Sequence, residues 1–238
     1  MNLLLFPTQA LGADNTLVVR DRQHQHLRNV LKVEVGSRVR VGAIDGEMGT
    51  AQVLATSETC TVLAVVLDSP PPAPLALKLV LALPRPKMMR RVMQTVASLG
   101  AKEIHLINSY KVDKSFWQTP WLTPDIIREQ CLLGLEQSGD TALPQVHLHK
   151  RFKPFVEDCL PAIIADTRAL VAHPYDAVSC PVGARGAITL AVGPEGGFIP
   201  YEIDKFVACG FEPVTLGTRI LRVETAIPVL IARLFTAV

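Results

Sequence analysis

Two glycine-containing segments near the carboxyl end of the chain carry the residues best suited to chemistry. Residues 193–197 read Gly-Pro-Glu-Gly-Gly, and residues 216–226 read Leu-Gly-Thr-Arg-Ile-Leu-Arg-Val-Glu-Thr-Ala. Glycine adopts positive φ and lets bare amides approach a ligand closely. The same segments hold the acids Glu195 and Glu224 and the cations Arg219 and Arg222, which could serve as a base and as stabilisers of negative charge. We therefore predict a pocket with walls made largely of main chain.

The elements around these segments alternate between buried strands and short helices. A predicted strand over 187–192 leads into the first segment, and a helix over 200–209, ended by Gly210, follows it. A second strand at 214–216 leads into the other segment, which precedes a helix over 226–234. Ligands of open α/β sheets bind outside the carboxyl ends of the strands. We expect both segments to meet there.

Upstream, the same alternation predicts the rest of an open parallel α/β sheet. Strands are expected at 77–83 and 104–107, separated by a helix over 87–99 that Gly100 closes. In that helix we predict a buried stripe of Met88, Val92 and Val96. Thr123-Pro124-Asp125 combines a capping oxygen, a proline and an early acid, so it predicts a helix that runs to about Gln137.

The first third of the chain has a pattern typical of short strands with few helices. We predict a strand start at 1–7, not a signal peptide, short strands at 17–19, 38–41, 50–54 and 60–67, and one helix over 24–31. The Asp45-Gly46 pair predicts a turn, because its glycine tolerates positive φ. The proline-rich residues 69–75 predict a stiff spacer. We therefore divide the chain into a small β-barrel domain (1–68), a linker (69–75) and an α/β domain (76–238).

Composition narrows the class of protein. The 238 residues have a formal net charge of +2 and 49% hydrophobic residues, so they predict a globular protein without a strong overall field. Local charge is uneven, because residues 69–102 contain six cations and no acid. Five widely spaced cysteines without a CxxC pair favour a reducing cytoplasm over disulfides or zinc. No apolar stretch approaches the length that spans a bilayer, and we expect no metal site.

Several stretches together resemble the 16S ribosomal RNA (uracil-N3) methyltransferase family of the SPOUT superfamily. They are the two glycine segments, Leu170–Pro174, Glu136–Gly139, Ser98–Gly100, the helix start at Lys87–Arg91, and His26–Lys32. The resemblance implies a PUA-like N-terminal barrel, an α/β domain with a C-terminal trefoil knot, and a homodimer. It also implies S-adenosylmethionine as cofactor and small-subunit ribosomal RNA as partner.

By the same resemblance, the loops near His173 and the two glycine segments hold the cofactor. The implied residues are Ala172, His173, Gly193, Pro194, Glu195, Gly196, Gly197, Leu216, Gly217, Ile220, Leu221 and Arg222. Uracil N3 carries a proton, so a base and a cation are both useful, and we predict Glu195 and Arg222 for these roles. A purely structural role for Glu195, which would hold its loop, is an equal alternative.

RNA contacts are predicted from the two basic clusters and from the N-terminal helix. The predicted residues are Arg20, His26, Arg28, Lys32, Arg85, Lys87 and Arg90. His24 is expected to cap its helix or to contact RNA. Asn29, Lys32 and Asp140 depart from the family pattern and weaken phosphate contacts. Two alternatives stay open at this point, a SPOUT enzyme acting on another RNA atom such as a ribose 2′-hydroxyl, and a non-catalytic RNA-binding assembly factor.

Overall fold

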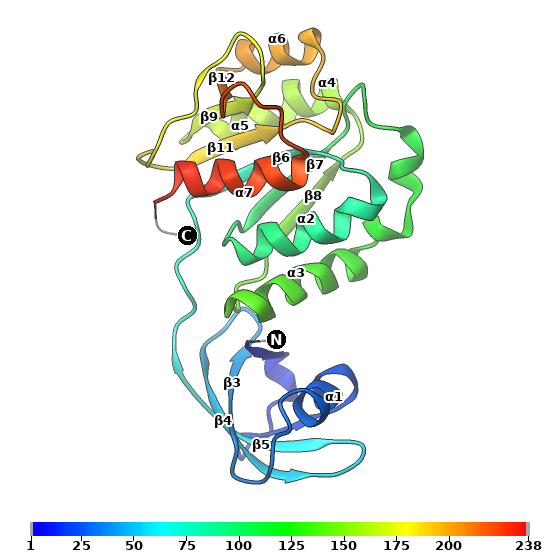
Figure 1. The fold of residues 1–238 in the computed structure, drawn as a ribbon, viewed down its shortest axis with the longest axis vertical. Coiled ribbons are helices and arrows are strands. Elements are labelled where there is room, and N and C mark those ends of the chain that lie inside the picture. Colours follow the sequence, from blue (N-terminus) through cyan, green and yellow to red (C-terminus); the bar gives the residue numbers. More distant parts are fainter. Residues whose placement is uncertain (1, 237–238) are drawn as a thin grey trace. The chain divides into compact units, whose positions relative to one another are not determined.

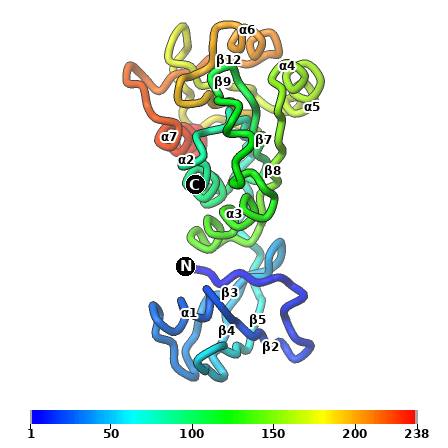
Figure 2. Tube along the Cα trace, turned by 90° about the vertical axis from the view of Figure 1, so that its right-hand side faces the viewer, coloured from blue at the N-terminus to red at the C-terminus, as the bar shows by residue number. Residues whose placement is uncertain are grey.

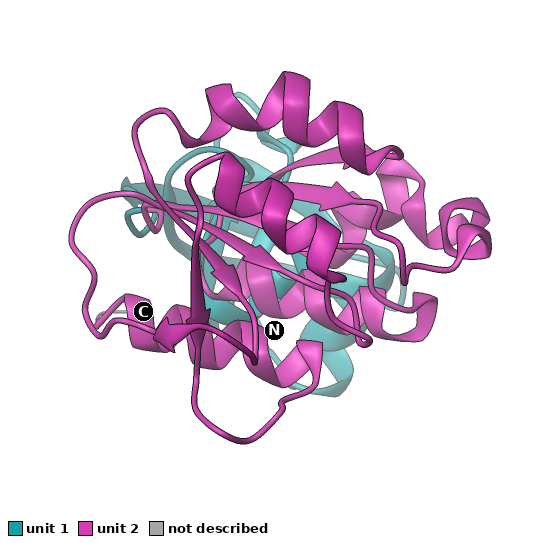
Figure 3. Cartoon of the chain, turned by 90° about the horizontal axis from the view of Figure 1, so that it is seen from above, with its two compact units in different colours: residues 1–73, 132–143 teal, residues 74–131, 144–238 magenta. Residues whose placement is uncertain are grey.

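The computed structural model describes residues 2–236, which fall into two compact units (Figure 3). Unit 1 contains the chain up to Ala73 together with Leu132–Leu143, and unit 2 contains Pro74–Cys131 and the chain from Pro144 onward. Helix α3 (Pro124–Ser138) contributes its first residues to unit 2 and its last ones to unit 1. None of the described helices is both long and apolar enough to cross a bilayer.

Unit 1 is built around one sheet with the strand order β1-β3-β4-β5-β2. Its strands are β1 (Leu4–Phe6), β2 (Thr16–Val19), β3 (Arg38–Ala43), β4 (Met48–Thr56) and β5 (Thr61–Ser69). β1 pairs with β3 in parallel, and the other neighbours are antiparallel. A 3-10 turn, η1 (Thr8–Ala10), follows β1. The predicted strands of this region are therefore confirmed, with most of their ends shifted by one or two residues.

One local prediction in unit 1 was wrong in detail, and another was confirmed. The helix predicted over 24–31 is α1 (Asp21–Asn29), which begins three residues earlier. The predicted turn at Asp45-Gly46 is present between β3 and β4, with positive φ on Asp45 (φ 58°). Asp45 tolerates this conformation because short polar side chains can bond locally, and its carboxylate accepts the Leu143 amide at 2.8 Å.

A buried carboxylate joins the sequence-distant parts of unit 1. Glu136 is 3% exposed, and its carboxylate accepts hydrogen bonds from Arg22 (2.7 Å) and Gln23 (3.0 Å). Its carbonyl oxygen also accepts the amides of Asn2 and Leu3. The paired charge satisfies a group that would be costly to bury alone. These bonds explain why residues 132–143 belong with the N-terminal strands.

Unit 2 contains a seven-stranded sheet with the order β10-β12-β9-β11-β6-β7-β8, and every pairing in it is parallel. The strands are β6 (Leu77–Ala82), β7 (Glu103–Ile107), β8 (Gln145–His149), β9 (Arg168–Ala172), β10 (Val178–Ser179), β11 (Ile188–Val192) and β12 (Glu212–Thr215). The prediction of a parallel α/β sheet is confirmed. β8, β10 and the helical segment 152–164 were not predicted.

Helices cover both faces of this sheet (Figures 1 and 2). α2 (Pro86–Ser98) and α7 (Val223–Leu234) pack together on one side, and α4 (Phe152–Pro154) and α5 (Leu160–Ile164) lie on the other. The chain between α2 and α7 also contains η2 (Lys114–Gln118), η3 (Pro120–Leu122), the π-helical η4 (Phe155–Cys159) and α6 (Pro200–Ala208).

The faces that these helices bury correct two further predictions. α2 buries Met89, Val92, Met93 and Val96, so its stripe contains Met89 rather than the half-buried Met88. α7 begins three residues before the predicted position 226. Gly100 and Gly210 end their helices with positive φ (86° and 98°), as expected for glycine after a helix.

Candidate functional site

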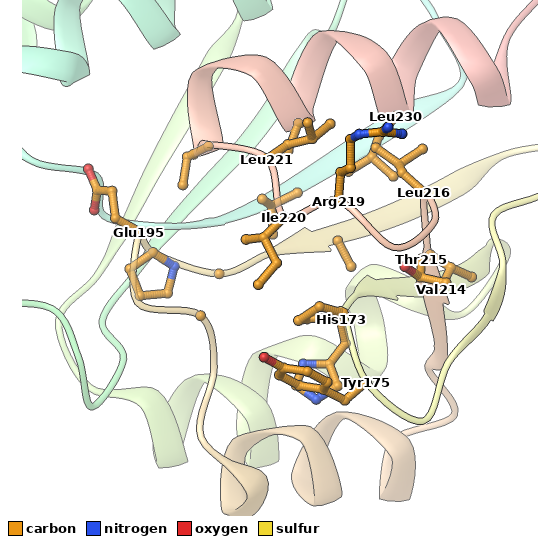
Figure 4. Close-up of a pocket in the computed structure, with 18 of the residues that line it drawn as sticks. His173, Tyr175, Glu195, Val214, Thr215, Leu216, Arg219, Ile220, Leu221 and Leu230 are labelled. Atoms are coloured by element: carbon orange, nitrogen blue, oxygen red, sulfur yellow. The ribbon is translucent and has the colours of Figure 1, made fainter.

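A cavity of about 260 Å³ opens at the carboxyl ends of β9, β11 and β12, where three loops of unit 2 meet (Figure 4). Small-molecule sites commonly measure about 300–1,000 Å³, so this cavity lies close to their lower limit. Its lining consists of Ala172–Tyr175, Val192–Gly197, Val214–Gly217, Arg219–Leu221, Val223, Ala226 and Leu230. Every cofactor-binding residue predicted from the sequence belongs to this lining except Arg222.

The strand order explains why loops distant in sequence meet here. β9 lies between β11 and β12, so the chain passes from β11 to β12 across β9. The carboxyl ends of these parallel strands therefore adjoin one another, and each continues into a lining loop. The walls are mostly apolar side chains and main chain, a composition typical of small-molecule sites.

Residues 193–197, the first loop, require glycine for identifiable reasons. Gly197 has φ 69°, a region that side-chain-bearing residues rarely adopt. At Gly193 an added Cβ would lie 3.0 Å from the Phe198 amide nitrogen, which leaves almost no room for a side chain. Gly196 differs, because its φ is not in the positive region and an added Cβ would meet only the flexible Lys111 side chain, at 2.8 Å.

The first loop is fastened from two sides. The Glu195 carboxylate accepts the Arg85 amide at 3.2 Å, immediately before α2 begins, and lies 4.0 Å from the Arg85 guanidinium. The Lys111 ammonium donates to the Gly196 carbonyl oxygen at 2.6 Å. A carboxylate at a helix N-terminus is favoured by the helix dipole. Two cations from outside the loop therefore hold it, Arg85 at Glu195 and Lys111 at Gly196.

Residues 216–222, the second loop, have fewer attachments. Gly217 has φ 123°, so glycine is required there as well, and the Thr215 hydroxyl accepts the Gly217 amide at 3.3 Å. Arg219 lines the cavity, and in Figure 4 it lies on the opposite side from Glu195, with Ile220 between them. Arg222 is exposed outside the lining, where its carbonyl accepts the first amides of α7.

His173 and Tyr175 form another wall of the cavity. The His173 amide donates to the Val214 carbonyl at 2.9 Å, and the two rings meet edge to face with centroids 5.8 Å apart. Burial, with a smaller contribution from the Lys111 charge, lowers the pKa of His173 below its usual value, although Asp176 opposes this shift. This shift favours the neutral imidazole of His173.

The predicted RNA-contacting residues fall into one group in each unit. In unit 1, Arg20, Arg28 and Lys32 are exposed on or beside α1, while His26 is half-buried. In unit 2, Arg85, Lys87 and Arg90 are exposed on the first turns of α2. The Arg90 guanidinium lies over the Trp121 ring, 5.0 Å from its centroid.

The role predicted for His24 was wrong. Its ring is 3% exposed and bonds Thr61 Oγ1 (2.9 Å) and the Glu58 carbonyl (3.2 Å), so it joins α1 to the sheet of unit 1. Within residues 2–236, no group of three or more metal-ligating side chains is placed to hold a metal ion. All five cysteines are free thiols.

Sequence reasoning missed two residues that hold the first loop or the chain next to it. Lys111 is one, and Glu202 on α6 is another: it is 2% exposed and accepts the amides of Tyr110 (2.7 Å) and Ile199 (3.0 Å). A basic residue in the loop that follows the predicted strand 104–107 was the available signal for Lys111. For Glu202, the signal was an acid in the first turn after Pro200, a position typical of capping glutamates.

The fold and the cavity define a class of protein, an α/β domain that binds a small ligand on main-chain loops at its strand ends, linked to a smaller β unit. Within this class, residues 71–235 match the family model of the RNA methyltransferase domain. The chain is 30% identical to ribosomal RNA small subunit methyltransferase E of Treponema pallidum, with 95% of this chain and 87% of the relative covered. It therefore belongs to this family of RNA methyltransferases.

Further relatives and solved structures are similar to this chain over nearly its whole length. The Synechocystis ribosomal RNA small subunit methyltransferase E is 29% identical, with 98% of this chain and 76% of the relative covered. A Legionella pneumophila methyltransferase, solved with bound SAM, matches with a TM-score of 0.76, 25% identity and 97% of both chains covered. The fold is also that of a Neisseria gonorrhoeae ribosomal RNA small subunit methyltransferase E, solved with S-adenosyl methionine (TM-score 0.77, 24% identity, 98% and 95% covered).

Proposed function

We propose that this protein transfers a methyl group from S-adenosylmethionine to N3 of a uridine in small-subunit ribosomal RNA. The observation that carries the proposal is the junction of both glycine loops in one cavity of a chain that belongs to the RNA methyltransferase family. The relatives named for small-subunit ribosomal RNA support the substrate, and the resemblance to the uracil-N3 family supports the atom. Such a substrate would place the reaction in the cytoplasm.

The residues of the cavity fit S-adenosylmethionine. Apolar walls from Val192, Val214 and Leu230 suit an adenine ring and a thioether-like chain, while the glycine loops offer main-chain donors and acceptors. We propose that the lining residues predicted above hold the cofactor, with Arg222 at the edge of the site. When bound, this cofactor supplies a methyl group on a positively charged sulfur.

The protein's own contribution is to align the base and to manage its proton. We propose that the Glu195 carboxylate takes the N3 proton, and that Arg222 stabilises the negative charge left on the uracil oxygens. Glu195 is part of the cavity lining and its side chain is 25% exposed, which supports contact with a substrate. Its bond to the Arg85 amide supports the alternative role of holding the loop.

The RNA would be bound by both groups of basic residues described above. We propose that unit 1 is a PUA-like barrel that contributes Arg20, His26, Arg28 and Lys32, while unit 2 contributes Arg85, Lys87 and Arg90. Contacts from lysine and arginine to phosphates give sequence-independent affinity that falls as salt rises. The mostly antiparallel sheet of unit 1 and its exposed cations support this assignment.

Two further proposals concern the architecture of unit 2. We propose that the loops around the cavity form the trefoil knot of SPOUT enzymes, which the passage of the chain from β11 to β12 across β9 supports. We also propose a homodimer that covers exposed apolar side chains beside the cavity, among them Ile220 (73% exposed) and Val229 (41%). Light scattering of the purified protein tests the dimer.

The test of the proposed function is a methylation assay on small-subunit particles from a strain that lacks this gene. Mass spectrometry of nuclease digests should find one added methyl group on a uracil ring after incubation with the protein and S-adenosylmethionine. A methyl group on a ribose would instead identify the alternative SPOUT activity. Binding to the particles without any methylation would identify an assembly factor.

A further inference from the structure

Residues 108–113, the loop after β7, are held firmly although they form no regular element. The Asn108 amide donates to the His149 carbonyl at 2.9 Å, and the Asn108 side-chain oxygen accepts Trp117 Nε1 at 2.9 Å. The Tyr110 amide donates to the buried Glu202 carboxylate at 2.7 Å, a charge-assisted bond in a protected place. The main chain of this loop is therefore fixed relative to both β8 and α6.

This fixed main chain displays two neighbouring side chains, Tyr110 and Lys111, and Lys111 reaches the cavity lining at Gly196. The Tyr110 side chain is 79% exposed, the highest value among the large hydrophobic and aromatic residues exposed in the described chain. Lys111 extends across Gly196, where the missing Cβ gives its stem room, and its ammonium bonds the Gly196 carbonyl at 2.6 Å. An ammonium has three donors, and this bond uses one.

The charge of Lys111 lies next to the cavity lining, because its ammonium bonds the carbonyl oxygen of Gly196. Burial is the main cause of the lowered pKa of His173, which belongs to the same lining, and the Lys111 charge adds a smaller lowering that is outweighed by the opposing charge of Asp176. Lys111 bonds the first loop at Gly196, and the residue before Gly196 in that loop is Glu195, which provides a carboxylate. A base and a cation thus adjoin the cavity lining, and the exposed Tyr110 is the neighbour of this cation in the sequence.

These groups match what a uracil base requires at N3. When the N3 proton passes to a carboxylate, the electron pair of the N–H bond stays on the ring and its charge spreads to O2 and O4. A cation held beside one of these oxygens stabilises the anion. A flat base drawn out of an RNA chain is commonly held by stacking on an aromatic side chain.

We propose that residues 108–113 form one wall of the site that receives the target base, with Tyr110 stacking on the base and Lys111 beside the oxygen that becomes negative. This inference rests on the proposed function and adds to it the residues that recognise the acceptor. It assigns the first loop to both substrates: its inner side faces the cofactor cavity, and its outer side carries the acceptor through Lys111.

The test compares Lys111→Met and Lys111→Arg in single-turnover methylation of small-subunit particles. Lys111→Met should lose on the order of 100-fold in rate, as for other single donors to a developing anion. The rising limb of its pH–rate profile should move to higher pH, because the N3 proton becomes harder to remove. Lys111→Arg should recover part of the rate. S-adenosylmethionine affinity, measured by calorimetry, should stay within a few-fold of the wild type.

For the ring, Tyr110→Ala should weaken equilibrium binding of the particles by about tenfold, while Tyr110→Phe should bind like the wild type. Matched controls are Tyr201→Ala and Lys153→Met, which remove an exposed tyrosine from α6 and an exposed lysine from α4.

The inference is overturned if Lys111→Met loses rate and cofactor affinity in parallel with an unmoved pH profile, because Lys111 would then only hold Gly196. It is also overturned if Tyr110→Ala binds like Tyr201→Ala. A wild-type protein that methylates nothing refutes the proposed function instead.

Discussion

The two glycine loops of the cavity are held in opposite ways. The first loop has Gly193 and Pro194 buried, its Glu195 carboxylate bonded to the Arg85 amide, and its Gly196 carbonyl bonded to Lys111. In the second loop, residues 217–222 are all exposed, and the Thr215 hydroxyl bonds at one end while the start of α7 holds the other.

This difference indicates a division of labour between the loops. A loop that is already fixed loses little conformational entropy when a ligand binds, whereas a loop held at its ends must be ordered at a cost in affinity. The first loop thus provides a preformed surface for both substrates. The second loop is expected to close on the cofactor, and substitutions there should affect cofactor affinity most.

The largest effect is expected for Gly217→Val. Gly217 is part of the cavity lining, and at φ 123° a β-branched residue is strained even though an added Cβ would meet no atom within 4 Å. We expect S-adenosylmethionine affinity to fall by more than about 100-fold, as strain of this kind costs about 1–3 kcal/mol and lost contacts add to it. Calorimetry measures the affinity.

The matched control for strain alone is Gly186→Val. Gly186 has φ 80°, lies before β11 and is not part of the cavity lining. It should lower the melting temperature by a comparable amount while the folded protein keeps its cofactor affinity. Equal losses of affinity in both variants would show that the second loop has no special role in binding.

A feature of the fold or the site could be predicted from the sequence when its cause lies in neighbouring residues, and was missed when its cause lies in residues far apart in the chain. Glycine at 197 and 217 is required by backbone conformation, which the sequence encodes directly, so both loops and the strands before them were predicted. Lys111 meets Gly196 across 85 positions of sequence, and only the strand order brings them together. β8 was missed although Gln145–His149 alternates polar and apolar residues, because the signal is short and the strand lies at the edge of the sheet without buried residues.

The next largest effect is expected in the first loop, where substitutions of Glu195 distinguish a catalytic base from a residue that only holds the loop. Glu195→Gln keeps an oxygen that can accept the Arg85 amide but removes the charge that would take a proton. If Glu195 is the base, the single-turnover rate should fall on the order of 100-fold with cofactor affinity nearly unchanged. A near-normal rate for Glu195→Gln, with weakened cofactor binding for Glu195→Ala, would leave Glu195 with a supporting role only.

A smaller effect is expected for Arg222, because its side chain is exposed outside the cavity lining while Arg219 is part of it. Arg222→Ala should lower the methylation rate by about tenfold, less than is usual for a donor placed directly at a developing anion. Arg219→Ala is the comparison, and we expect it to weaken cofactor binding instead. A common loss of melting temperature and cofactor affinity in Arg222→Ala would assign Arg222 to the start of α7 alone.

The smallest effect should come from Gly196→Ala, which tests whether the glycines of the two loops are equivalent. The sequence alone suggests that any bulk at 196 is as harmful as bulk at 217. In the structure the new methyl group would meet only Lys111 Cδ at 2.8 Å, and a flexible stem can move aside. Cofactor affinity should therefore fall only a few-fold, while the loss of the Lys111–Gly196 bond lowers the methylation rate more than the affinity. An affinity loss as large as that of Gly217→Val would mean that the Lys111 bond itself shapes the cofactor cavity, and that the first loop is not preformed.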